Sequence, residues 1–246
     1  MSTAEWTGTP LAALLEAAGV RPGAREIVFR GTDRGIDRGI EHDYARSLTV
    51  AEAMRPDVLV VHAMNGQPLL PQHGAPLRLV VPGWYGMASV KWLADIEAVA
   101  QPFDGVQQLE SYHFRAQAGE PGVPCTHIRV NSLMAPPGIP DFYTRRRLVK
   151  TGRVQIIGRA WSGGGVQIGQ VEVSVDGAWH EARLDAQAGP WAWRGWSFDW
   201  DAAPGEHVLA CRATDANGAV QPVEPVADVS GFGNNSAQRV QVTVHA

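Results

Sequence analysis

A chain of 246 residues is long enough for one large domain or two of ordinary size, and its 45% hydrophobic and 19% charged residues are typical of a folded globular protein. The formal net charge of −4 disfavours nucleic acid and anionic membranes as partners, because a polyanion is bound by a surplus of Lys and Arg. Cys125 and Cys211 are the only cysteines and form no CxxC pair, which argues against a disulfide framework or a thiolate zinc site.

No apolar run reaches the roughly 18 residues that a membrane-spanning helix needs. The residues after Met1 also lack the basic and apolar regions of a signal peptide. We therefore expect a soluble protein, with the compartment left open between cytoplasm and periplasm.

Short helices and strands alternate over the first 110 residues. Residues 9–19 predict an amphipathic helix with Pro10 at its first turn and Gly19 after its end. Residues 26–29 predict a strand, and the charged residues of 31–43 predict a polar loop. Residues 49–52 form a capping box that predicts a second helix, which Arg55-Pro56 would end.

The next signals lead into a stretch rich in basic residues and glycine. Val58–His62 predicts a buried strand, and Asn65-Gly66 predicts a hairpin turn after it. Residues 77–81 predict a short strand that Pro82-Gly83 ends, and residues 90–99 predict another strand. Helices interspersed with strands indicate a mixed α/β layer.

Residues 73–92 bring together side chains that suit a phosphate-bearing ligand. Arg78 offers a planar fork of donors, Lys91 a point charge, and His73 and Ser89 further polar groups. Free N–H groups from Gly83 to Val90 would add to such a site. A solvated basic strand edge is the commoner origin of this spacing, and both readings stay open on chemistry alone.

Glycine, proline and alanine dominate residues 115–141, which we interpret as a connection between two domains. The residues beyond it predict only β-structure, with alternating runs at 154–161, 170–175, 191–200, 206–214 and 239–244. Six of the nine tryptophans lie between positions 161 and 200, which suits two sheets packed face to face around aromatic rings. We expect a sandwich of the immunoglobulin type.

A resemblance to a known family adds what spacing cannot. The stretch MNGQPLLPQHGAPLRLVVPGWYGMASVKW resembles the second half of the molybdopterin domain of the sulfite oxidase family, which includes sulfite oxidases and assimilatory nitrate reductases. The stretches GRAWSGGG, VEVSVDG, WAWRGWSF and CRATDANGAVQP resemble the dimerisation domain that follows it.

The resemblance implies a fold, a cofactor and partners. The fold would be α+β over residues 1–125, a truncated molybdopterin-binding domain, followed by an all-β immunoglobulin-like dimerisation domain over 126–246. The cofactor would be molybdenum-molybdopterin, and the reaction an oxygen-atom transfer to sulfite or a similar small oxyanion. A homodimer and an electron-acceptor protein are the implied partners.

Site residues are carried over by matching motifs. Asp33 in GTD, and His73 and Arg78 in HGAPLR, match cofactor contacts, as do Ser89, Val90 and Lys91 in SVKW. Tyr112 in ESYHF lies where the family has an active-site tyrosine. A half-buried tyrosine with a purely structural role is an equally common explanation of such a residue. Arg239 falls near an arginine that binds the substrate oxyanion, and an exposed strand arginine is its ordinary explanation.

The family's molybdenum-binding cysteine, in a Cys-Xaa-Gly-Asn-Arg-type motif, would lie before the point that matches Met1. Cys125 matches no metal ligand, so no metal ligand is assigned and activity of this chain alone is doubtful. Three hypotheses follow: the carboxy-terminal part of a sulfite-oxidase-like enzyme, a non-catalytic dimeric scaffold or anion- and pterin-binding remnant, and a subunit completed by a separate chain.

Overall fold

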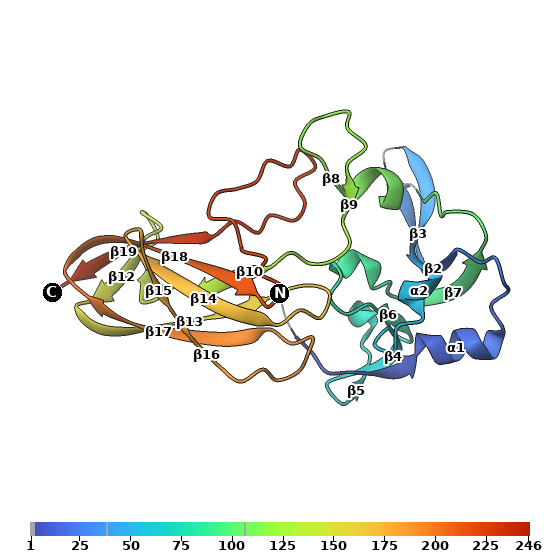
Figure 1. The fold of residues 1–246 in the computed structure, drawn as a ribbon, viewed down its shortest axis with the longest axis horizontal. Helices are drawn as coiled ribbons and strands as arrows, with labels where there is room; N and C mark the ends of the chain where they lie inside the picture. Colours follow the sequence, from blue (N-terminus) through green and yellow to red (C-terminus); the bar gives the residue numbers. More distant parts are fainter. Residues whose placement is uncertain (1–2, 38, 106) are drawn as a thin grey trace. The chain divides into compact units, whose positions relative to one another are not determined.

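The computed structural model describes residues 3–37, 39–105 and 107–246. The chain divides into two compact units, Met1–His127 and Ile128–Ala246, which run from blue to green and from yellow-green to red in Figure 1. Each unit has a hydrophobic core of its own.

The first unit is mostly β-structure, with two short α-helices among its described residues. Its strands are β1 Trp6–Pro10, β2 Glu26–Asp37, β3 Ile40–Thr49, β4 Leu59–Met64, β5 Gln67–Pro68, β6 Arg78–Val80, β7 Leu93–Val99, β8 His113–Phe114 and β9 Val123–Pro124. Its helices are α1 Leu11–Ala18 and α2 Val50–Ala53, with short 3₁₀ turns η1 Pro71–His73 and η2 Gly86–Ala88 and a π-turn η3 Gln107–Ser111. Helices contribute less than the predicted mixed layer implies.

Antiparallel pairing builds two main sheets in this unit. One has the order β1-β4-β5 with β6 also paired to β4, and the other has the order β3-β2-β7. A core with Phe29 and Leu79 at its centre draws on both sheets and on α1. The stretch 73–92 therefore contains a strand, β6, that is anchored in this core through Leu79.

Local signals locate both helices correctly. Helix α1 begins directly after Pro10, which is the N-cap rather than a first-turn residue, and ends at Gly19 in the left-handed conformation. Helix α2 has the predicted capping box, in which Thr49 and Glu52 bond reciprocally. The predicted hairpin turn forms at Asn65 and Gly66, both with positive φ, between β4 and β5.

The predicted polar loop over residues 31–43 is wrong. Strands β2 and β3 continue through it and pair in antiparallel register with a shift between Arg30 and Arg34. Arg34 Nε lies 3.2 Å from Glu41 Oε1 and 3.7 Å from Asp43 Oδ1, so the crowded charges pair across the ribbon. The structure does not describe Arg38, which was assigned to the same loop.

The second unit consists of strands. They are β10 Asn131–Ala135, β11 Ile139–Pro140, β12 Arg147–Lys150, β13 Gly152–Trp161, β14 Ile168–Val175, β15 Ala178–Glu181, β16 Arg183–Leu184, β17 Arg194–Ala202, β18 Gly205–Asp215 and β19 Gln238–His245. They form two sheets, of order β10-β13-β17-β16 and β11-β12-β19-β18-β14-β15, and only β12 and β19 pair in parallel. All five predicted β-runs are present.

One core joins the two sheets, because Ile156 and Trp196 from the first pack with Val173 and Leu209 from the second. The prediction that the clustered tryptophans fill this core is only partly right. Trp196 and Trp200 are buried in it, whereas the other four stay partly exposed. Successive side chains of a strand point to opposite faces of the sheet, so a tryptophan on a strand can point outward as well as into the core.

No helix among the described residues is both long and apolar enough to cross a membrane.

Candidate functional site

The two cations predicted to hold a cofactor meet at one turn. Arg78, at the start of β6, donates from Nη1 to the carbonyl oxygen of His73 at 3.0 Å. Lys91 donates from Nζ to the carbonyl oxygen of Gln72 at 3.2 Å. These are neighbouring carbonyls of η1, so side chains thirteen positions apart converge on the same 3₁₀ turn.

Gly74 makes this convergence possible. It ends η1 with φ of 101°, a conformation that favours glycine. A Cβ at this position would come 2.9 Å from the Cβ of Lys91. Trp92 fixes the other side, since its indole Nε1 donates to the Pro71 carbonyl at 2.8 Å. His73 itself is half-buried, and the structure engages its carbonyl rather than its ring.

Arg78 is half-buried and has no carboxylate within ion-pair distance among the described side chains. Its guanidinium lies 4.9 Å from the ring centroid of Trp6 and donates from Nη2 to the Ser89 carbonyl at 3.2 Å. Burial lowers the pKa of Arg78, because charge is costly to desolvate. With a weak contact from Nε to the Leu79 carbonyl, three of five N–H donors are engaged and two remain.

The expectation of a run of free N–H groups from Gly83 to Val90 is only partly right, because most of these groups are engaged within the protein. Residues 86–88 form the 3₁₀ turn η2, and the N–H groups of Ala88, Ser89 and Val90 donate to carbonyls within the loop. The N–H of Tyr85 donates to the Thr126 carbonyl at 2.9 Å. No sequence signature marks this turn. The N–H groups of Gly83, Gly86 and Met87 are the ones in the loop that have no described acceptor.

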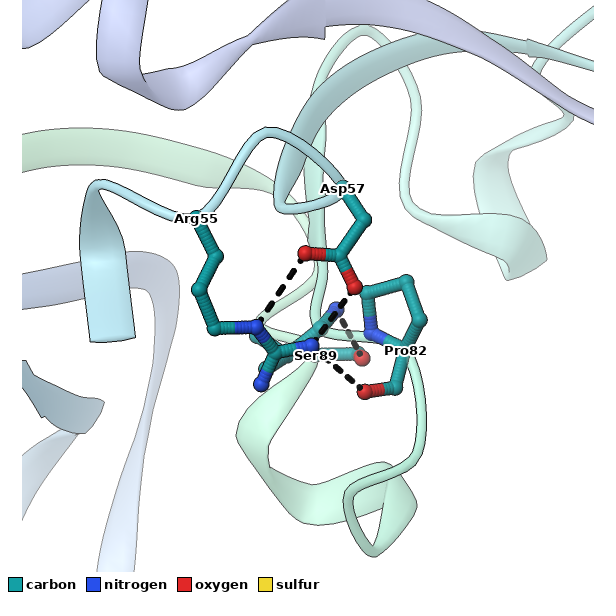
Figure 2. A network of polar contacts seen from close by, with 5 residues as sticks. Arg55, Asp57, Pro82 and Ser89 are labelled. Atoms are coloured by element: carbon teal, nitrogen blue, oxygen red, sulfur yellow. Dashed lines mark hydrogen bonds and ion pairs between the residues drawn. The ribbon is translucent and has the colours of Figure 1, made fainter. Parts of the chain in front are cut away.

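Polar contacts fix the root of this loop, as Figure 2 shows. Arg55 binds both oxygens of Asp57, at 3.1 and 2.6 Å, and also reaches the Pro82 carbonyl at 3.3 Å. The Ser89 hydroxyl oxygen accepts from the Val81 N–H at 3.1 Å. The Ser89 side chain thus joins the end of the loop to the residue that follows β6.

Val90 is fully buried, and its peptide groups are already paired. Its N–H donates to the Ala88 carbonyl at 3.1 Å, and its carbonyl accepts from the Leu79 N–H at 2.8 Å. In the segment 89–91, Lys91 is therefore the residue with spare donors on a half-buried side chain.

Asp33 presents a buried acceptor beside Lys91. Its Oδ1 is shielded from solvent and has no hydrogen-bond partner within the described chain. A Cβ at Gly31 would collide with this oxygen and would come 2.8 Å from the Lys91 carbonyl oxygen. A bare glycine backbone thus lies between the Asp33 carboxylate and the backbone of Lys91. An orphaned buried acceptor is expensive unless a ligand donor meets it.

Tyr112 belongs to an aromatic cluster that sequence reasoning missed. The guanidinium carbon of Arg46 lies 5.1 Å from the Tyr112 ring centroid and 4.3 Å from that of Tyr44. Tyr44 donates its hydroxyl to the Met87 carbonyl at 2.8 Å. Burial raises the pKa of Tyr44, the charge of Arg46 opposes this rise, and Tyr112 and Asp33 add smaller increases. Alternation along β3 would have placed Tyr44 and Arg46 on one face had residues 41–43 not been taken as a loop.

A cavity of about 210 Å³ opens beside this cluster. Its walls include Arg46, Tyr112, Trp84, Met87 and Cys125. The predicted cofactor residues Arg78 and Lys91 do not contribute to this wall. Tyr112 therefore faces a space separate from the turn at which the two cations meet.

Arg239 lies in the other unit. It is exposed on β19 and forms an ion pair with Glu224, as an ordinary surface arginine does.

Both cysteines are buried. Burial raises the pKa of Cys211 to about 11, which keeps it a thiol in the core of the second unit. Cys125 lies beside Tyr112, since its N–H donates to the Tyr112 carbonyl at 2.8 Å. Within the described ranges, no group of three or more His, Cys, Asp and Glu side chains is arranged to hold a metal ion.

Comparison with known proteins supplies the family. Residues 1–107 match the model of the oxidoreductase molybdopterin binding domain, and residues 125–245 match that of the Mo-co oxidoreductase dimerisation domain. The chain belongs to the sulfite oxidase family of molybdenum cofactor-dependent oxidoreductases.

Sulfite oxidases and nitrate reductases are similar in sequence to nearly the whole chain. Human mitochondrial sulfite oxidase is 34% identical over 99% of this chain and 47% of its own length, and the NADH nitrate reductase of Ulva prolifera is 31% identical over 98% and 31%. The crystal structure of the sulfane dehydrogenase SoxCD from Paracoccus pantotrophus matches with a TM-score of 0.82 and 29% identity, over 99% of this chain and 63% of that one. The chain thus spans about half the length of the human sulfite oxidase and about a third of the length of the Ulva nitrate reductase.

Proposed function

We propose that this chain is the molybdopterin-holding and dimer-forming part of a sulfite-oxidase-like enzyme that oxidises sulfite or a similar small oxyanion. The second unit would be an immunoglobulin-type sandwich through which two copies associate. An electron-acceptor protein would take up the electrons that the reaction releases.

The observation that carries this proposal is the convergence of Arg78 and Lys91 on η1. Lys91 has three N–H donors and a single described acceptor, the Gln72 carbonyl, so it can also bind the phosphate of a pterin. The orphaned Oδ1 of Asp33 suits the N–H donors of a pterin ring. The bare backbones of Gly31 and Gly74 permit close approach. These groups fit a molybdopterin by their chemistry.

A bound molybdenum cofactor supplies two-electron oxidation with transfer of an oxygen atom. The residues of this chain would do the rest. Arg78 keeps η1 and the 86–91 loop together, so that Lys91 stays oriented. Tyr112 would donate its hydroxyl proton in a hydrogen bond to a substrate oxygen in the adjoining cavity.

Sulfite-dependent reduction of ferricyanide tests this function. The 246-residue chain alone should show no turnover, because it carries no assigned thiolate ligand for molybdenum. A longer version that includes the family's cysteine motif, purified from cells that make molybdopterin, should show turnover. In that version Tyr112→Phe should lower kcat about tenfold to a hundredfold, since it removes one hydrogen bond to a charged group. The matched control is Tyr143→Phe, whose hydroxyl belongs to an 89% exposed side chain of the second unit. A longer version with neither molybdenum nor turnover would favour the scaffold hypothesis instead.

A further inference from the structure

The loop of residues 82–91 begins at two residues that have few hydrogen bonds of their own. Pro82 has no N–H, and the N–H of Gly83 has no acceptor among the described residues. Gly83 also has a φ of 78°, a conformation that favours glycine. The one described side-chain hydrogen bond to this pair comes from Arg55, whose Nη2 donates to the Pro82 carbonyl at 3.3 Å. Arg55 therefore anchors the point at which the loop begins.

Asp57 holds the Arg55 guanidinium in the orientation that this contact needs. Nε and Nη2 of Arg55 meet Oδ1 and Oδ2 of Asp57 at 3.1 and 2.6 Å, and two parallel bonds fix the guanidinium plane as well as its position. Pro56 lies between the two residues, and its fixed φ limits the freedom of the turn. The side chains of Arg55 and Asp57 are 26% and 23% exposed. Figure 2 shows the fork of Arg55 on Asp57 and its reach to Pro82.

A short series of contacts leads from Pro82 to the predicted cofactor residues. The N–H of Val81, which precedes Pro82, donates to the Ser89 hydroxyl oxygen at 3.1 Å. The Ser89 carbonyl accepts from Arg78 Nη2 at 3.2 Å, and Lys91 follows two positions later. Because the two ends of the loop are joined in this way, a shift at Pro82 would displace the segment that carries Lys91.

Folding stability alone does not require the contact with the loop. Ion pairs contribute modestly to stability, because their attraction is offset by the loss of hydration. Arg30 of the same unit shows the simpler arrangement, in which Nη1 contacts Asp95 and Glu97, both at 2.7 Å, across β2 and β7. Arg55 differs from Arg30 because it binds a loop carbonyl in addition to its carboxylate.

We propose that Arg55 and Asp57 are positioning residues for cofactor binding. They hold the first residue of the loop, so that Lys91 stays beside η1, where it can bind the phosphate of a pterin. Neither Arg55 nor Asp57 would touch the cofactor itself. This inference rests on the proposed function, because it assumes that Lys91 binds the pterin.

Retention of pterin after dialysis tests this role in protein from cells that make molybdopterin, with the pterin measured by fluorescence after acid oxidation. Arg55→Met should retain at least about threefold less pterin than wild type, because the loop loses a charged hydrogen bond at Pro82. Arg55→Lys keeps the charge but not the planar fork, so it should restore the melting temperature without restoring pterin retention.

The matched control is Arg30→Met, which removes a guanidinium from the same unit without touching the loop. It should lower the melting temperature, because Asp95 and Glu97 are left unpaired, and it should retain pterin as wild type does. Amide hydrogen exchange of residues 81–91 in cofactor-free protein reports on the loop itself. Exchange there should be faster in Arg55→Met and unchanged in Arg30→Met.

The outcomes separate this inference from the proposed function. Wild-type pterin retention in a folded Arg55→Met variant, or in Arg55→Lys, would overturn the positioning role. If Arg55→Met does not fold, Arg55→Lys decides alone. Absence of pterin from the wild-type protein would count against the proposed function instead, and unchanged loop exchange in the Arg55 variants would then refute the anchoring of the loop.

Discussion

Arg212 and Arg239 of the second unit meet carboxylates, whereas Arg46 and Arg78 of the first unit do not. Arg212 Nε lies 2.7 Å from Glu172 Oε2, and Arg239 pairs with Glu224. Arg46 and Arg78 are buried or half-buried, yet their described acceptors are carbonyl, amide and thioether groups. The same residue type thus has two different environments in one chain.

Lack of a carboxylate does not by itself mark a functional cation, because half-buried Arg147 and Arg194 of the second unit also donate to carbonyl groups. The depth of burial is what sets Arg46 apart, since it is 2% exposed. A buried cation is costly to desolvate, and a unit that needs it only for folding gains by placing a carboxylate beside it.

In the first unit, no carboxylate among the described residues pairs with Arg46 or Arg78. Asp33 Oδ1 and Trp84 Nε1 also lack described partners there. Trp196 Nε1 and Ser132 Oγ of the second unit also lack described partners, so the first unit differs in combining such groups with a fully buried cation, which is typical of a binding region.

Truncation of the central tryptophan should produce the largest change, and only in the second unit. Trp196 is 1% exposed, and its ring lies where a Cβ of Gly158 would collide. Trp196→Ala should lower the free energy of unfolding by about 3–5 kcal/mol, as large-to-small core changes do. Denaturant titration measures it. The control is Trp191→Ala, at a 38% exposed position, and an equal loss there would contradict the assigned core.

A smaller effect should follow pH. His207 bonds Asp176 Oδ2 at 2.7 Å through Nδ1 and the Ala203 carbonyl at 2.9 Å through Nε2, and the Asp176 contact raises its pKa above the ordinary 6.5. Protonation of His207 therefore stabilises the second unit below pH 6.5, and this stability is lost as pH rises through the raised pKa. The melting temperature should fall over that range, and His207→Gln should remove the trend. A trend that persists in the variant would refute this assignment.

Removal of the exposed cation Arg239 should have the smallest effect on stability. Arg239 pairs with Glu224 in solvent, where such pairs contribute little. Arg239→Ala should leave the unfolding midpoint unchanged within error. The variant should also take up cofactor as wild type does, if the site lies on the first unit as proposed. A loss of sulfite turnover in Arg239→Ala would instead restore its role as a substrate residue.

The sequence predicted what local signals encode. The capping box at Thr49 and Glu52, the glycine after α1 and the Asn65-Gly66 turn each act within a few residues, and each forms as expected. The convergence of Arg78 and Lys91 could also be anticipated, because a short strand and a glycine loop separate them.

Burial and pairing across the fold could not be predicted. Arg46 looks like a surface residue in a charged segment, and only the pairing of β3 with β2 and the packing of η3 against it bury its guanidinium. Likewise the N–H groups of Tyr85, Ala88, Ser89 and Val90 look free in the sequence, whereas the structure pairs them with the Thr126 carbonyl and with carbonyls of the loop itself. Partners distant in sequence decide the burial of Arg46 and the Tyr85 contact, whereas the bonds of η2 are local but carry no sequence signature.

The pterin content of purified protein tests the central claim most directly. Protein from cells that make molybdopterin should release pterin on acid oxidation, measured by fluorescence. The double variant Arg78→Met/Lys91→Met should lose at least about tenfold of it, because two charged hydrogen-bond donors are removed. The control Lys150→Met, at an exposed position of β12, should keep the full amount. An unchanged pterin content in a folded double variant, or none in the wild type, would contradict the claim that these two cations hold the cofactor.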